Sequence, residues 1–171
     1  MARLYWTTLT AFLALTACVP VEPVPSSPVT TSTAVSRADL GTLLNAARAA
    51  NDLPPLRANA KLTAAARAHA LDMARGGFFS HVGSNSSTPS QRVDAQGYSF
   101  CFVAENIAQG WTTPDQVMQG WMDSPGHRSN TLSPKATDVG AAGAEGEYWV
   151  LVFGHPGCGA GRTALTQRKP R

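Results

Sequence analysis

The chain has 171 residues, of which 43% are hydrophobic and 15% are charged, a composition typical of one globular domain with its own core. Its formal charge of +3 comes from the two ends, because the part between Arg3 and the basic residues beyond Cys158 is slightly acidic. A nucleic-acid-binding protein needs a basic surface with a recognisable motif, so we expect no nucleic-acid partner. No internal repeat is present.

The N-terminus predicts export. Arg3 precedes an apolar run from Leu4 to Leu15, which is too short to span a bilayer stably. A Leu-Thr-Ala-Cys sequence then closes on Cys18 and resembles a bacterial lipobox, in which the cysteine is lipidated and becomes the new N-terminus. We interpret residues 1–17 as a signal peptide and Cys18 as the lipidation site. The alternative is an ordinary signal cleaved after Ala17, which leaves the cysteine unmodified.

Residues 18–36 are predicted to be a tether. They are rich in Pro, Ser, Thr and Val, with too little bulky apolar content to fold. The expected location is the cell envelope, with the membrane as a partner through the lipid anchor. An outer membrane is favoured if the cell has one, because Val19 and not an aspartate follows the cysteine. Residues 159–171 are expected to form a disordered basic tail.

Residues 37–158 are predicted to form the folded domain, as a monomer. Apolar residues recur at helical spacing from Leu40 to Ala47 and predict a first helix from Ala38 to about Ala50, capped by Ser36. The Pro54-Pro55 pair stops this helix.

A second helix is capped by Asn59 and ends at the glycine pair 76–77. One of its faces carries Leu62, Ala66, His69 and Met73. We therefore interpret His69 as a core histidine with a local partner and not as a site residue. Pro89 opens a short third helix that ends at Gly97.

The second half of the chain alternates strands and a helix. Residues 98–103 are strand-like, and Thr113 caps a helix with a proline at its first position. Pro125 breaks this helix and carries His127 into a bend. Strands follow at Val139–Gly143 and Tyr148–Phe153.

The last of these strands has bulky residues on both faces, as a covered central strand would. Helices around a small sheet predict one α/β/α sandwich domain of the α/β class.

Three polar segments carry the candidate chemistry. A Ser-His-Val-Gly motif contains His81, an Ala-Glu-Asn-Ile-Ala motif contains Glu105, and a Trp-Met-Asp-Ser-Pro-Gly-His-Arg motif contains Asp123 and His127. About twenty residues separate successive motifs, so only a folded pocket brings them together. Imidazoles and a carboxylate bind divalent metals or transfer protons near neutral pH. The alternative is a buried hydrogen-bond network that holds loops together.

In this order the motifs resemble the CAP superfamily, or SCP-like domain, of cysteine-rich secretory and plant pathogenesis-related proteins. The likeness runs from Asp39 to Gly157 and includes an Asn-Ala-Ala-Arg segment ending at Arg48, the Leu-Pro-Pro-Leu loop at 53–56 and the strand at 148–153. The resemblance implies the CAP fold, with a small mainly antiparallel sheet between helices, in a bacterial lipoprotein branch.

The resemblance also implies a site. Many eukaryotic members place two histidines and two acids in a central cavity, and some cavities bind zinc or another divalent ion. His81 matches the first histidine and Glu105 the glutamate. Asp123 is a shifted match for the second acid, and Glu147 stands where the second histidine is usual. His127, from a segment typical of bacterial members, would supply the second imidazole.

We therefore expect His81, Glu105 and His127 to converge in one cleft, with Asp123 or Glu147 at its rim. No cofactor is assigned with certainty. If a divalent metal such as zinc binds, the two histidines and Glu105 are its expected ligands.

The resemblance places the segments around Cys101 and Cys158 in strands of one sheet, which implies a disulfide bridge in an exported protein. The competing interpretation makes Cys101 a nucleophile activated by a histidine.

Three functions remain open. The favoured one is a tethered ligand-binding domain whose cleft holds an envelope lipid or glycan. The alternatives are a metal-dependent envelope hydrolase and a purely structural envelope protein. The sequence contains neither a His-Glu-x-x-His helix nor a Gly-x-Ser-x-Gly elbow, so catalysis has the weaker support and the catalytic residues are unknown.

Overall fold

The computed structural model describes residues 35–157. Within them the elements follow in the order α1 (Val35–Ala49), β1 (Arg57–Ala58), α2 (Ala60–Gly76), α3 (Pro89–Ala95), β2 (Phe100–Gln109), α4 (Pro114–Asp123), α5 (Pro125–Thr131), β3 (Asp138–Ala144) and β4 (Tyr148–Pro156). The described residues do not include the predicted signal peptide, Cys18, the tether up to residue 34, Cys158 or the basic tail. None of the helices within 35–157 has the length and apolar character that a membrane span requires.

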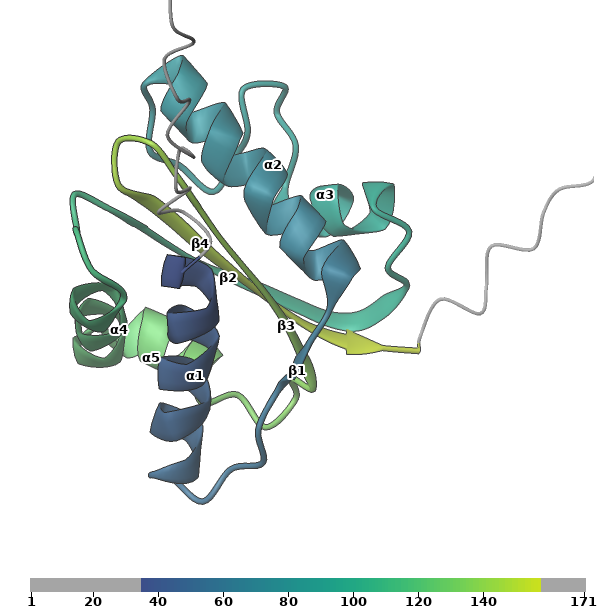
Figure 1. Cartoon of the computed structure of the whole chain (residues 1–171). Helices are drawn as coiled ribbons and strands as arrows, with labels where there is room; N and C mark the ends of the chain where they lie inside the picture. The colour runs from purple at the N-terminus through teal and green to yellow at the C-terminus, as the bar shows by residue number, and fades with distance from the viewer. Residues whose placement is uncertain (1–34, 158–171) are drawn as a thin grey trace, which may run out of the picture. The chain divides into compact units, whose positions relative to one another are not determined.

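The strands form one mixed sheet in the order β1-β3-β4-β2 (Figure 1). The short β1 runs parallel to β3, and β4 pairs antiparallel with both β3 and β2. Strand β4 therefore lies in the middle of the sheet, as its sequence predicts, and β2 forms an open edge.

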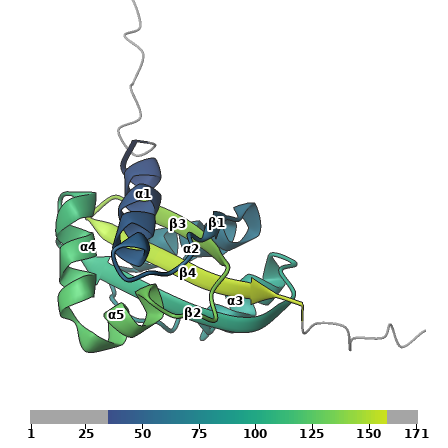
Figure 2. The same cartoon turned by 90° about the horizontal axis from the view of Figure 1, so that it is seen from below.

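Helices cover both faces of this sheet. Helices α2 and α3 lie on one face, and α1, α4 and α5 lie on the other (Figures 1 and 2). Strand β4 alternates between two hydrophobic clusters. Trp149, Leu151 and Phe153 pack in the α1/α4 cluster, and Tyr148, Val150 and Val152 pack in the α2/α3 cluster. The predicted α/β/α sandwich is confirmed.

A close approach joins α2 to the sheet at Gly140. A Cβ atom at this position would lie 2.1 Å from the backbone of Leu62 and Thr63, so only glycine permits the contact. This approach fixes the height of α2 above the sheet, and with it the position of His69 on the same helix.

The predicted helix ends are largely confirmed. Asn59 accepts hydrogen bonds from the backbone of Lys61 and Leu62 at the start of α2, and Gly77 ends that helix in the left-handed conformation. Thr88 caps α3 and Thr113 caps α4, each in a reciprocal capping box with a glutamine.

Three local predictions are wrong. Helix α1 begins at Val35, so Ser36 lies inside the helix and is not its N-cap. His127 lies in the short helix α5 and not in a bend, because Pro125 ends one helix and is also well suited to start the next. Strand β2 continues to Gln109, beyond the predicted end at residue 103, so Glu105 lies within the strand.

Candidate functional site

The edge strand β2 places two adjacent polar residues on opposite faces of the sheet. Glu105 lies on the same face as Ile107, toward α2 and α3, and Asn106 lies on the same face as Ala108, toward α1 and α4. Both residues are buried, with Asn106 fully so. Buried polar groups need hydrogen-bond partners, and the partners of these two residues define the site.

The carboxylate of Glu105 is bound on both oxygens. His81 Nδ1 donates to Oε1 at 2.8 Å, and Arg92 Nη2 donates to Oε2 at 2.8 Å. The Glu105 side chain is 1% exposed and that of Arg92 is 9% exposed. The two opposite charges therefore neutralise each other in a region that water hardly reaches.

Arg92 also holds the loop that carries His81. Its Nη1 donates to the carbonyl oxygen of Ser87 at 2.7 Å, and its Nη2 donates to that of His81 at 3.0 Å. Arg92 is not among the residues predicted from the sequence. It lies next to Val93, a buried residue of the capped helix α3, and no local sequence pattern distinguishes it from the exposed arginines.

His69 is the buried histidine next to Glu105. It is fully buried, its Nε2 donates to the carbonyl oxygen of Ser80 at 2.8 Å, and the same nitrogen lies 3.9 Å from Glu105 Oε1. Its Nδ1 has no hydrogen-bond partner among residues 35–157. Burial is the main cause that lowers the pKa of His69, so the ring is neutral near pH 7.

The prediction that His69 is a core histidine with a local partner is confirmed, but its exclusion from the site is wrong. Its hydrogen bond to Ser80 fixes the residue immediately before His81.

His81 is the exposed member of the site. Its side chain is 49% exposed, although Nδ1 is fixed by Glu105. Because the carboxylate accepts a hydrogen bond from Nδ1–H, the neutral ring carries its lone pair on Nε2. Within the described residues Nε2 makes no hydrogen bond and is open to a ligand.

His127 approaches from the other face of the sheet. Its ring lies 6.5 Å from that of Trp121, centroid to centroid. Burial is the main cause that lowers the pKa of His127, and a proton on the nearby His81 lowers it further. The two histidines therefore flank the edge strand β2 from opposite faces of the sheet, without a hydrogen bond between their rings. Their convergence in one cleft stays a prediction.

Asn106 holds α5 against this edge. Its Nδ2 donates to the carbonyl oxygen of His127 at 3.0 Å and to Thr131 Oγ1 at 3.2 Å, and its Oδ1 accepts from Asn130 at 2.9 Å. Glu105 thus fixes the ring of His81 on one face of the strand, and Asn106 fixes the backbone of His127 on the other face.

Asp123 and Glu147 do not join this cluster. Asp123 is exposed at the end of α4 and accepts hydrogen bonds from Gln119. Glu147 lies in the turn between β3 and β4 with a positive φ of 61°. The β2–β4 register pairs Glu105 with Val152, so Glu147 lies at the far end of this ladder.

The donor set does not fit a metal centre in the observed arrangement. Arg92 brings a positive charge to 2.8 Å from Glu105, where it opposes a second cation, and His81 offers only one open nitrogen. No group of three or more His, Cys, Asp or Glu side chains in the described part of the chain is placed to hold a metal ion.

Together these features define an α/β/α domain with a buried carboxylate beneath a half-exposed imidazole at a sheet edge. Comparison with known proteins identifies the family. The profile of CAP, the cysteine-rich secretory protein family, matches residues 42–153, and the chain belongs to this family.

Three similar proteins support the assignment. The uncharacterized protein YkwD of Bacillus subtilis is 37% identical over 112 residues, which are 65% of this chain and 44% of YkwD. An extracellular SCP-domain protein of Bacillus anthracis superposes with a TM-score of 0.71 at 26% identity, covering 76% of this chain and 45% of that one. An outer surface protein of Borrelia burgdorferi shares the fold, with a TM-score of 0.65 at 21% identity over 70% of this chain and 92% of that one.

The chain thus spans less than half of YkwD and of the Bacillus anthracis protein. The two structural neighbours are extracellular or surface proteins, so the domain is of a kind found in bacterial extracellular proteins.

Proposed function

We propose that this chain is an exported, envelope-tethered CAP-domain protein that binds a ligand through His81 and His127. The observation that carries the proposal is the fixed but open imidazole of His81. Its Nδ1 is bound to a carboxylate that is 1% exposed, while the side chain itself is 49% exposed. A purely structural hydrogen bond does not require its donor to remain open to solvent.

The site favours a ligand that donates hydrogen bonds. The pKa of His127 is lowered, so its ring is neutral near pH 7. A neutral imidazole offers one lone pair, and in the neutral form of His81 this lone pair lies on Nε2, because Nδ1 is bound to Glu105. Arg92 offsets the charge of Glu105, so the site has no strong attraction for cations. Hydroxyl-rich ligands, such as cell-wall glycans or lipid headgroups, match this chemistry.

A binding experiment tests this proposal. The full chain is titrated by calorimetry with cell-wall glycan fragments and with vesicles of envelope lipids. We expect one of these to bind, and His81→Ala and His127→Ala to weaken the binding by about tenfold or more. His155→Ala is the matched control, because this histidine contacts Thr137 and makes no hydrogen bond with His81, Glu105 or His127.

Two outcomes contradict the proposal. If the histidine variants bind as the unmodified protein does, the site is not the binding surface. If nothing binds and the variants only lose about 1–3 kcal/mol of stability, the cluster is a structural network. Elemental analysis of the same samples checks the metal-dependent alternative, which needs bound metal that both variants lose.

The tether has a separate test. We expect Cys18 to be lipidated and the chain to fractionate with membranes. The variant Cys18→Ser should then lose membrane association and lipid-dependent processing. Unchanged fractionation would show that the lipobox interpretation is wrong.

The predicted Cys101–Cys158 bridge is supported by the sheet register. Cys101 lies in a bulge of β2 between residues that pair with Pro156 and His155, close in sequence to Cys158. A bridge here would add on the order of 4 kcal/mol of stability by the chain-entropy estimate. Thiol counting on the unfolded, unreduced protein tests it, and two free thiols at positions 101 and 158 would contradict it.

A further inference from the structure

A hollow of about 730 Å³ lies between the C-terminal half of α2 and the turn that joins β3 and β4. Figure 1 shows this turn at the same end of the sheet as the end of α2. The helix contributes Arg67, Leu71 and Arg75 to the lining of the hollow, and the hairpin contributes Glu145 and Tyr148. None of the site residues His69, His81, Arg92, Glu105 and His127 lines this hollow.

The hollow exists because small residues surround it. Larger side chains would fill the angle between helix and hairpin. The small residues that leave this space are Ala74, Gly143, Ala144 and Gly146. Gly146 has a φ of +79°, and a Cβ there would lie 3.1 Å from the Tyr148 ring. The turn therefore requires glycine at this position.

Two arginines give the hollow its charge. Arg67 and Arg75 are eight residues apart on α2, so they lie on one face about 12 Å apart along the helix axis, with Leu71 between them. Within residues 40–157 neither of them has a hydrogen bond or an ion pair. The other arginines of this range each donate at least one hydrogen bond: Arg48, Arg57, Arg92 and Arg128.

We propose that this hollow is a second binding site, for an acidic glycan whose anionic groups are held by Arg67 and Arg75. Guanidinium groups bind carboxylates and phosphates through paired hydrogen bonds. Two of them in series along a helix suit an extended ligand that carries acidic groups at intervals. The carboxylate of Glu145 and the side-chain amide of Gln109 face the same hollow and match the hydroxyl groups of a sugar.

The test uses the full chain and three probes: an oligouronate, a neutral oligosaccharide of equal length, and inorganic phosphate. We expect the oligouronate to bind and the double variant Arg67→Gln/Arg75→Gln to weaken it by about tenfold or more. Arg128→Gln is the matched control, because it removes one positive charge where the side chain contacts Asn51. The lysine pair Arg67→Lys/Arg75→Lys should retain part of the affinity, since lysine keeps the positive charge but lacks the paired, planar donors of the guanidinium group.

Several results would overturn the proposal: no binding of the oligouronate, binding of the neutral sugar that Arg67→Gln/Arg75→Gln weakens to the same extent, equal loss in Arg128→Gln, or full competition by phosphate alone. A glycan bearing phosphate in place of carboxylate shows which acid the site prefers. His81→Ala should leave this binding unchanged, so that failure here and failure of the His81 site are distinguishable.

Discussion

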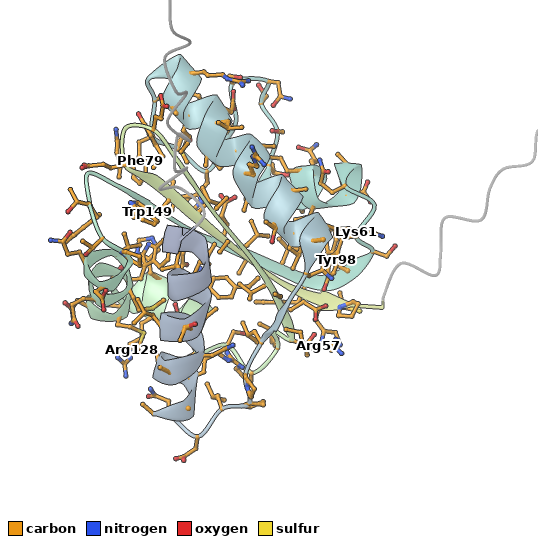
Figure 3. All side chains as sticks on the ribbon, in the orientation of Figure 1. Arg57, Lys61, Phe79, Tyr98, Arg128 and Trp149 are labelled. Atoms are coloured by element: carbon orange, nitrogen blue, oxygen red, sulfur yellow. The ribbon has the colours of Figure 1, made fainter. Side chains whose placement is uncertain are left out.

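Two buried carboxylates on neighbouring parts of the sheet form nearly the same kinds of bonds, yet their surroundings differ. Glu105 accepts hydrogen bonds from Arg92 and His81, and Asp138 accepts them from Arg57 Nε at 3.0 Å and from the Tyr98 hydroxyl at 2.7 Å. Figure 3 shows Arg57 and Tyr98 at the end of the sheet where β1 and β3 pair.

The difference is in the exposure of the partners. The Arg92 side chain is 9% exposed, whereas that of Arg57 is 73% exposed and can be solvated without its partner. Around Glu105 the charge is enclosed and an imidazole is open. Around Asp138 the positive partner, Arg57, is exposed, and the neutral partner, the Tyr98 hydroxyl, is buried. The first arrangement leaves an imidazole accessible from solvent, and the second joins β3 to the start of β2.

The largest expected effect is that of Glu105→Gln. This change keeps the side-chain shape but leaves the buried Arg92 without a counter-charge, so we expect the free energy of unfolding to fall by about 3–5 kcal/mol. Urea denaturation measures it. The double variant Glu105→Gln/Arg92→Met should lose less than the sum of the two single changes, and strict additivity would contradict the coupling.

A smaller effect is expected for Asp138→Asn. The Tyr98 hydroxyl loses a charged acceptor, but Arg57 turns to water, so the loss should be about 1–3 kcal/mol. Arg57→Ala should cost less than about 1 kcal/mol, because the exposed pair is screened by solvent. If Asp138→Asn destabilises as strongly as Glu105→Gln, partner exposure does not explain the contrast.

The two regions should also differ in the direction of their pH dependence. The pKa values of His69 and His127 are lowered, mainly by burial, so the unfolded chain binds protons below about pH 6.5 more readily than the folded one. Stability from this region is present above that pH and is lost as the pH falls. His127→Gln should reduce the slope of stability against pH between about 7 and 5, whereas Tyr98→Phe should not.

The smallest effect is expected on the alkaline side. Burial and the hydrogen bond to Asp138 raise the pKa of Tyr98, so the hydroxyl stays protonated in the folded protein. Its contribution is complete below about pH 10 and declines as the pH rises further, because the unfolded chain ionises first. Tyr98→Phe should weaken this alkaline decline in denaturation curves, and His127→Gln should leave it intact.

Local signals were sufficient for much of the fold. Asn59 and Thr113 have side chains that bond the first turn of a helix, so they mark helix starts without long-range information. The alternation of bulky residues in β4 likewise requires only that both of its faces be covered. The motifs around His81, Glu105 and His127 also predicted the family, because their order along the chain resembles that of CAP proteins.

The tertiary structure decided the rest. Strand β2 extends through Glu105 to Gln109 because β4 lies beside it as far as Tyr148 and supplies the hydrogen bonds. Arg92 joins the site because α3 packs on the same face of the sheet, a contact that no local pattern indicates. The sequence alone predicted His81, Glu105 and His127 as candidate site residues, but not Arg92 or His69. Only the packing of helices around an edge strand decided which of them are enclosed, which are open, and which charges neutralise one another, since burial depends on the whole fold.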